Sequence, residues 1–189
     1  MAEKLIEIKI DEKKLRQIQQ MLRDVPAKMG LVISRSINRT TAGARADIAR
    51  EIAGRVNMKQ AAIKKGIIQK KSNRNYWQGE LDITSRRIPL IEFSAGQTAR
   101  GVTYRIDKTG GRQLRESAFI ATMASGHTGV FRRKAKGRLP IVELRGPSVG
   151  IVFEGAAGLT RRIEALAYKK LEQNIDSQVR YILEKRKTG

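Results

Sequence analysis

The spacing of apolar residues changes twice along this chain, and these changes limit its fold more than any other feature. Between residues 11 and 53 apolar side chains recur every three or four positions, which predicts amphipathic helices. Between residues 77 and 144 they alternate with polar ones, which predicts half-buried strands. The helical spacing returns after residue 158. We therefore expect an α+β fold in which a mainly antiparallel β-sheet packs against a long N-terminal helical arm and a C-terminal amphipathic helix.

The chain of 189 residues is long enough to bury one substantial core. We expect a single domain over residues 1–189, made of an N-terminal strand and helical arm (1–72), a β-sheet region (73–157) and a C-terminal helix (158–189). The absence of cysteine excludes disulfides and thiolate metal sites. No stretch is apolar for long enough to cross a membrane, and the first residues lack a secretory signal, so we expect synthesis in the cytoplasm.

The helical arm begins with an alternating strand at residues 6–10, after which Asp11 stands where a helix N-cap belongs. A long helix follows from about residue 27 to residue 53, and Gly54 can end it. Asn57 and Gln60 form a capping-box pattern that starts a short helix, which Gly66 can end. Residues 44–65 therefore also resemble a DNA-reading helix-turn-helix, an alternative that the sequence leaves open.

The sheet region is divided by turn signals into short strands. The predicted strands span residues 77–83, 88–93, 101–106, 118–123, 129–133, 139–144 and 150–153. The last of these apolar strands before residue 145 ends at Arg145–Ser148, where Gly146 and Pro147 stop a strand from continuing. The segment from Asp107 to Glu116 has two central glycines and polar flanks, and we expect it to be a mobile loop.

Positive charge is spread over the whole chain. Lys and Arg total 39 against 18 acids, a net charge of +21, and each of the three regions carries more bases than acids. The folded body itself must therefore be basic, and such a surface attracts polyanions regardless of their sequence. Nucleic acid and acidic protein neighbours are both compatible with this charge.

Two basic clusters are the candidate contact sites. The leading one places five cations in seven residues, on a strand end and its adjoining loop: Arg132, Arg133, Lys134, Lys136 and Arg138. The secondary one forms a basic hinge between the helical arm and the sheet region: Lys64, Lys65, Lys70, Lys71 and Arg74. Each cluster is a candidate for contact with DNA or with another subunit.

No catalytic or metal-binding constellation stands out. His127 is the only histidine, and Ser125, two residues earlier in the same turn, is badly placed to be activated by it. No carboxylate lies near His127 in sequence, so we expect it to make local hydrogen bonds in its turn. Glu80, Asp82 and Glu92 occupy positions typical of a solvent-facing strand side. We expect no enzyme activity, no metal and no cofactor, and a nuclease is the least supported class.

One stretch carries a family resemblance. The ordered residues Phe119–Met123, Gly126-His127, Gly129–Arg133, Leu139–Ile141 and Glu143-Leu144, followed by Gly146–Ser148, resemble the minor tail protein Z family of long-tailed bacteriophages. Residues 34–65 resemble the helical half of that family.

The resemblance implies a virion protein at the top of the tail, assembled in the cytoplasm of the bacterial host. It implies tail completion and head–tail joining, a homo-oligomeric ring that we expect to be six-fold, and contacts with other tail and head–tail connector proteins. The family carries no catalytic residues that could be transferred. A ring on the DNA exit path would give the basic charge a use in non-specific contact with double-stranded DNA. The alternative is a non-catalytic basic DNA-binding protein outside the virion.

Overall fold

The computed structural model describes residues 2–187, and their contacts fall into two compact units. The helical unit comprises residues 2–48, 67–83 and 157–187, and the sheet unit comprises residues 49–66 and 84–156. Helices and short antiparallel strands are both present, so the predicted α+β class is confirmed. The predicted division of one domain into three regions stays a prediction.

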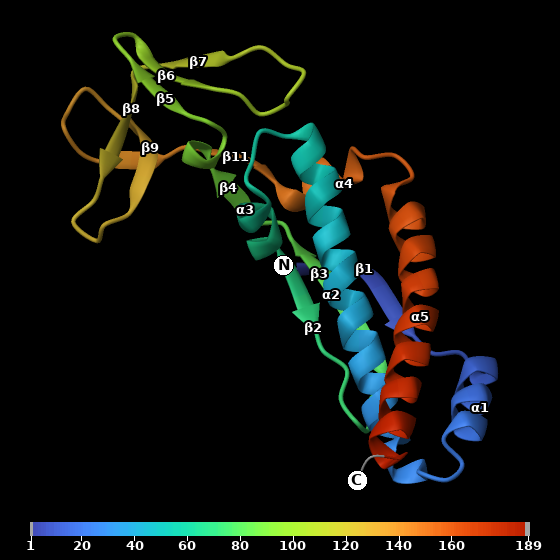
Figure 1. Cartoon of the computed structure of the whole chain (residues 1–189). Coiled ribbons are helices and arrows are strands. Elements are labelled where there is room, and N and C mark those ends of the chain that lie inside the picture. The colour runs from blue at the N-terminus through green and yellow to red at the C-terminus, as the bar shows by residue number, and fades with distance from the viewer. Residues whose placement is uncertain (1, 188–189) are drawn as a thin grey trace. The chain divides into compact units, whose positions relative to one another are not determined.

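The helical unit joins a small sheet to three helices (Figure 1). Its strands are β1 (Ala2–Lys9), β2 (Ile67–Lys70) and β3 (Gln78–Thr84), in the order β1-β3-β2, and β2 runs antiparallel to β3. Its helices are α1 (Glu12–Met21), the larger part of α2 (Met29–Arg55) and α5 (Leu159–Lys187), with a short 3-10 helix at Pro26–Lys28. Figure 1 shows α2 and α5 side by side, and α5 also contacts β1.

Helix α2 is the centre of this unit, because apolar side chains are buried around much of its circumference. Ile33, Ile37 and Ile48 are fully buried. Strand β3 approaches the helix closely at Gly79, where an added Cβ would lie 2.7 Å from the Ile37 side chain. Only glycine fits there, and it allows the sheet to pack directly on the helix.

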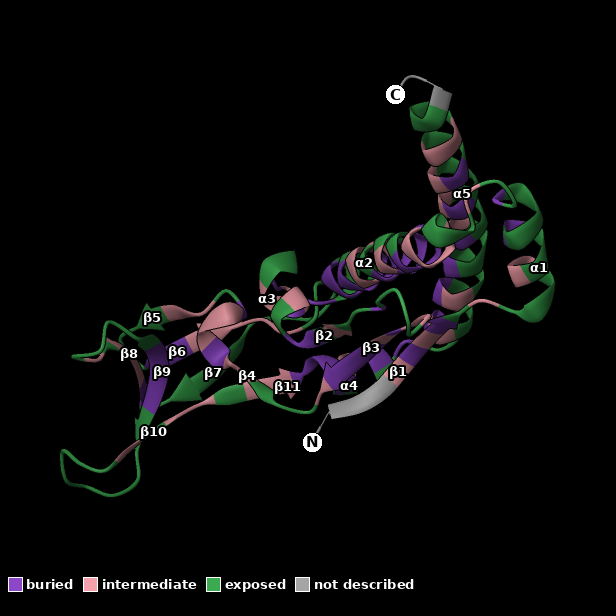
Figure 2. Ribbon diagram, turned by 90° about the horizontal axis from the view of Figure 1, so that it is seen from below, coloured by how far each residue is buried: buried purple, intermediate pink, exposed green. Residues whose placement is uncertain are grey.

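Helix α5 buries one stripe, as its apolar spacing predicted. Every fourth residue is buried, and Figure 2 shows this stripe in purple: Leu159, Ile163, Ala167, Leu171, Ile175 and Val179. Polar links add to the packing against α2, because Lys170 pairs with Asp47 and Asn174 donates to the Thr40 hydroxyl at 2.9 Å. Asp11 caps α1 as predicted, accepting from the Lys14 amide at 2.6 Å.

The sheet unit holds the remaining strands in three small antiparallel sheets. Their orders are β10-β9-β8, β5-β6-β7 and β11-β4. The strands are β4 (Arg87–Pro89), β5 (Gly96–Thr98), β6 (Gly101–Tyr104), β7 (Gln113–Glu116), β8 (Ala118–Thr122), β9 (Thr128–Arg133), β10 (Ile141–Glu143) and β11 (Arg145–Ser148). Three short helices complete the unit: α3 (Gln60–Lys65), a 3-10 helix at Leu90–Glu92 and α4 (Val149–Glu154). Phe93, Val102 and Val130 are fully buried in its core.

Two short elements follow residue 144 that the sequence did not predict. Strand β10 ends at Glu143, before Gly146 and Pro147, but Arg145–Ser148 then forms a further strand, β11, which pairs with β4. The expected strand at 150–153 is helix α4, because the Ser148 side chain caps it and accepts from the Ile151 amide at 3.2 Å. Val149 and Phe153 are then buried one helical turn apart.

Three further boundaries differ from the predictions. The expected strand at 88–93 is split, because a 3-10 turn at Leu90–Glu92 follows the three residues of β4. The expected mobile loop at 107–116 ends in strand β7, which pairs with β6. The Asn57/Gln60 capping box is absent: Lys59 is the N-cap of α3 and makes no side-chain cap, while the Asn57 amide donates to the Ile106 carbonyl at 2.7 Å. Helix α2 also continues through Gly54 to Arg55.

Candidate functional site

The leading basic cluster lies on the sheet β10-β9-β8. Strand β9 pairs with β8 on one side and β10 on the other, and the connection between β9 and β10 carries the cations beyond the strand end. The Lys134 amide donates to the Pro140 carbonyl at 3.0 Å and closes this connection. We call residues 134–140 the basic loop. Every residue of the loop is exposed, and Figure 2 shows the segment next to β10 in green.

The two arginines at the end of β9 do not act as one group. Adjacent residues of a strand point to opposite faces of its sheet. Arg133 lies over the Phe119 ring, with its guanidinium carbon 5.5 Å from the ring centre, while Arg132 lies opposite Ala118 and Val142 on the other face. The stacked position holds Arg133 by a cation–π contact. A flat partner can therefore contact only one of the two arginines through the strand itself.

The cations of the basic loop are exposed and lie beyond the strand that carries the two arginines. Within the part of the chain that the structure describes, Lys134, Lys136 and Arg138 make no ion pair. Leu139, in the same loop, is 70% exposed. The loop thus presents unpaired positive charge, which suits contact with a phosphate backbone, beside an apolar side chain, which suits contact with another subunit.

The secondary cluster is divided between the two units. Lys64 and Lys65 end helix α3 in the sheet unit, while Lys70, Lys71 and Arg74 belong to the helical unit. Lys70 forms ion pairs with two carboxylates, at 2.9 Å from Asp82 and 3.0 Å from Glu80. The hydrogen bonds to Asp82 and to Glu80 raise the pKa of Lys70 above its ordinary value.

The segment after Lys70 is not a free hinge. The Asn38 side chain on α2 donates to the Ser72 carbonyl at 2.9 Å and accepts from the Ser72 amide at 2.8 Å. The Ser72 hydroxyl in turn donates to the Tyr76 carbonyl at 2.7 Å. These bonds fasten the connection between β2 and β3 to the helix, and Lys71 and Arg74 project from it as exposed side chains.

His127 makes a contact that the sequence analysis missed. Its Nε2 lies 2.6 Å from Oε1 of Glu143, and Oε2 of Glu143 accepts from Arg145 at 2.7 Å. The expectation of purely local hydrogen bonds for His127 was wrong. A signal existed: pairing the predicted strands 129–133 and 139–144 as a hairpin brings Glu143 back beside the His127 turn. Gly129 leaves room for this carboxylate, because an added Cβ would lie 3.0 Å from Oε1.

The acids that were expected to face solvent do not all do so. Asp82 is only 6% exposed and pairs with Lys70, so that expectation was wrong for Asp82. Among residues 2–187 no three His, Cys, Asp or Glu side chains gather to hold a metal ion. In the same part of the chain no helix is both long and apolar enough to span a bilayer.

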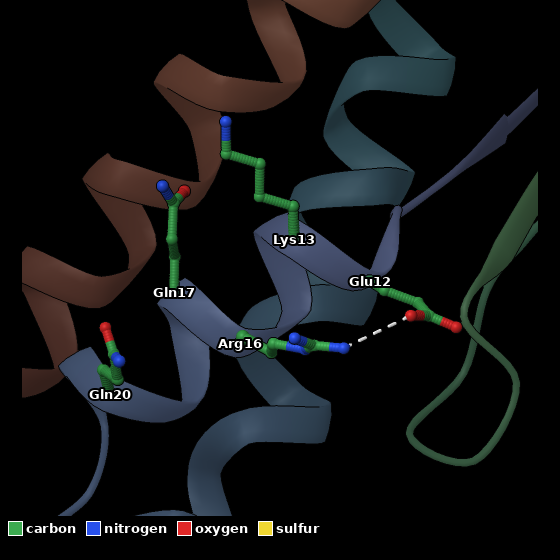
Figure 3. Close-up of a pocket in the computed structure, with 5 residues that line it drawn as sticks. All are labelled: Glu12, Lys13, Arg16, Gln17 and Gln20. Atoms are coloured by element: carbon green, nitrogen blue, oxygen red, sulfur yellow. Dashed lines mark ion pairs between the residues drawn. The ribbon is translucent and has the colours of Figure 1, made fainter.

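A hollow along α1 is lined by exposed polar and charged side chains and is an ordinary hydrated surface. Figure 3 shows that its side chains all come from this one helix: Glu12, Lys13, Arg16, Gln17 and Gln20. Arg16 pairs with Glu12 one turn earlier at 3.5 Å, and both side chains are more than three-quarters exposed. Exposed pairs of this kind stabilise a helix slightly and do not by themselves form a binding site.

The family model for prophage minor tail protein Z (GPZ) matches residues 8–185 of the chain. The chain belongs to this family. The match covers both helical regions and the sheet region, so the resemblance found in the sequence is confirmed over nearly the whole length. No curated protein and no solved structure matches the chain. The protein is a phage minor tail protein, and this membership favours a structural role in the virion over an enzymatic one.

Proposed function

We propose that this minor tail protein completes the tail and joins it to the head, as a homo-oligomeric ring around the DNA path at the tail neck. We expect the ring to be six-fold and to contact other tail and head–tail connector proteins. The observation that carries the proposal is the basic loop, whose three cations are exposed and make no ion pair among the described residues. A ring that holds and releases a genome needs contacts with the phosphate backbone, which are independent of base sequence.

The charge of the whole chain supports the same role. A net charge of +21 is spread over all three regions and gives the body an attraction for polyanions. Since the loop cations face solvent, their charge is available to phosphates without breaking existing ion pairs. We infer non-specific, salt-sensitive binding to duplex DNA.

The alternative, a helix-turn-helix DNA reader at residues 44–65, has weaker support. Helix α3 contains six residues, about 9 Å of helix, and its Ile63 is fully buried. The segment before it is hydrogen-bonded to the strand-like segment at 106–107. A reader of base edges needs a freely exposed helix that enters the major groove.

Salt dependence tests the loop directly. Replacing Arg133, Lys134, Lys136 and Arg138 with Gln should flatten the plot of log affinity for duplex DNA against log salt by about two to four units, near one for each phosphate that the variant no longer neutralises. The measurement is fluorescence anisotropy with a labelled duplex of arbitrary sequence. Folding should be nearly unaffected, because these substitutions lie at the surface.

A matched control removes the same charge elsewhere. Four exposed cations of the helical unit serve for this purpose: Lys13, Arg161, Lys169 and Arg180. Their replacement with Gln should leave the salt slope closer to that of the parent protein. An equal decrease of slope in both variants would assign DNA binding to diffuse charge rather than to the loop, and a preference for one duplex sequence would favour the alternative.

A further inference from the structure

The sheet unit contains a pocket whose lining includes no residue of the basic loop. Its volume is about 370 Å³, and it lies among the end of α3, the chain after β3, strand β4 and the strands β10 and β11. We call it the basic pocket and define it by six polar or charged residues of its lining: Lys65, Arg86, Arg87, His127, Glu143 and Arg145. Ile88, Pro89 and Ala62 give it an apolar part. A volume of this size is at the lower end of the range for ligand sites and accommodates a few side-chain-sized groups.

One wall of the pocket is fixed by its own hydrogen bonds. Both oxygens of Glu143 are engaged, one with His127 at 2.6 Å and one with Arg145 at 2.7 Å. The Arg145 guanidinium also donates to the Arg87 carbonyl at 3.4 Å. Glu143 is 14% exposed at its side chain, and its ion pair with Arg145 balances its charge within the wall.

The other cations of the pocket are left without partners. Among residues 2–187, the side chains of Lys65, Arg86 and Arg87 form no ion pair, and all three residues are exposed. Glu92 is the one further carboxylate in the lining. The pocket therefore offers an excess of unpaired positive charge beside an apolar surface.

Unpaired positive charge beside an apolar surface favours some classes of anionic ligand over others. A DNA duplex is a wide, rigid rod whose phosphates meet protruding cations, and it brings no apolar group to cover Ile88 and Pro89. An acidic peptide can place a carboxylate on the arginines and an apolar side chain on that surface in one short segment. A second copy of this chain is a poor source of such a segment, because the net charge is +21 and the only adjacent acids are Asp11 and Glu12.

We propose that the basic pocket binds an acidic segment of another polypeptide. Carboxylates of the segment pair with Lys65, Arg86 and Arg87, and an apolar side chain of the segment packs on Ile88 and Pro89. Arg145, held by Glu143, keeps the wall of the pocket in place. None of the pocket residues belongs to the basic loop, although Lys65 is also a member of the secondary basic cluster. The proposal therefore does not depend on ring formation or on DNA binding by the basic loop.

The probe is a short labelled peptide of alternating Glu and Leu, with the same peptide carrying Gln in place of Glu as its neutral counterpart. Binding is followed by fluorescence anisotropy at physiological salt. The double variant Arg86→Gln/Arg87→Gln should weaken binding about tenfold or more, because it removes two direct ion pairs. Ala62→Phe, which narrows the pocket without a change of charge, should weaken binding by a similar factor. The matched control, Lys134→Gln/Lys136→Gln, removes two charges from the basic loop and should change the Kd less than about twofold.

The outcomes are distinct. Binding of the Glu peptide and not of the Gln peptide, with the expected order of variants, supports the pocket. The proposal fails if the parent protein does not bind the Glu peptide, if the loop variant loses as much affinity as the pocket variant, or if Ala62→Phe binds normally. It also fails if Arg86→Gln/Arg87→Gln abolishes DNA binding and leaves peptide binding intact, since the pocket would then be a phosphate site. Circular dichroism of each variant confirms that the fold is retained.

Discussion

Lys70 joins strands β2 and β3 on their charged face. It lies opposite Glu80 in the strand register and also reaches Asp82, two residues further along β3. One Oδ of Asp82 is buried and has no hydrogen-bond partner among the described residues, so Lys70 balances its charge through the other oxygen alone. Removal of Lys70 would leave two neighbouring carboxylates facing each other, one of them buried.

Replacement of Lys70 by Met should therefore lower the Tm at pH 8. The effect should depend on pH in a defined direction. The pKa of Lys70 is raised in the folded protein above its unfolded value of about 10.4. The contribution of the ammonium group is then complete below about pH 10 and is lost as the pH rises through the raised folded-state pKa.

The measurement is urea unfolding of the parent protein and of Lys70→Met between pH 8 and pH 12. The difference in free energy of unfolding should be largest at pH 8 and should shrink above about pH 10. Lys71→Met, a change at the next residue in the chain, is the control, because Lys71 is exposed and makes no ion pair among the described residues. A difference that stays constant over this range would show that Lys70 acts through its packing and not through its charge.

For single residues, the sequence predicted the face of the strand on which a side chain lies better than it predicted whether that side chain is buried. Leu81 and Ile83 are buried as the alternation of β3 predicted. Asp82 is buried as well, because β3 is the central strand of its sheet, and alternation cannot distinguish a central strand from an edge strand. The contact of His127 with Glu143 joins residues 16 positions apart, so only strand pairing brings them together.

Among the secondary-structure elements, α4 is the one whose helical conformation depends most on a single N-cap. It has six residues, too few to be stable through its own backbone bonds. The Ser148 hydroxyl accepts from the Ile151 amide, and Ser148 itself is buried. Ser148→Ala should destabilise the protein by about 1 kcal/mol. This corresponds to a fall in Tm of about 2–4 °C for a chain of this size.

Hydrogen exchange at individual amides shows where Ser148→Ala destabilises the protein. The Ile151 amide loses its acceptor in Ser148→Ala, so its exchange should become faster than in the parent protein. Ser125→Ala, in an exposed turn of the same unit, should leave both the Tm and this amide unchanged. Unchanged protection of Ile151 in Ser148→Ala would mean that burial of Val149 and Phe153, and not the cap, holds the helix.

Long elements followed from the sequence and short ones did not. Helices α2 and α5 extend over many turns, so their apolar spacing was unambiguous. Strand β4, strand β11 and helix α4 have three to six residues each, and a short apolar run does not distinguish helix from strand. The cap at Ser148 and the pairing of β11 with β4 decide their types, and the second of these is a long-range contact.

For the whole molecule, the composition predicted a positively charged surface but not the division of the chain into two compact units. The even spread of charge indicates a basic body rather than a basic tail. The division into two compact units was not visible, because the chain passes between them inside helix α2 and again at residues 66, 83 and 156. Such a division depends on contacts between distant segments, which local spacing does not encode.

The charge also governs how copies of the protein can assemble. Each subunit carries +21, so subunits repel one another when they approach to form a ring. Salt screens this repulsion, with a Debye length of about 30 Å at 0.01 M and about 10 Å at 0.1 M. Duplex DNA neutralises it directly. If the proposed ring forms, its population should therefore increase either with salt or with DNA at low salt.

Light scattering coupled to size-exclusion chromatography gives the absolute mass under each condition. We expect a closed oligomer whose mass is a fixed multiple of the 21.2 kDa subunit, with a larger share of oligomer at about 0.3 M salt than at about 0.02 M. At the lower salt, a short duplex should restore the oligomer. A monomer at every salt and protein concentration would contradict self-assembly. A complex of one subunit with one duplex would instead favour DNA binding without a ring, because a ring needs subunit contacts that persist around the DNA.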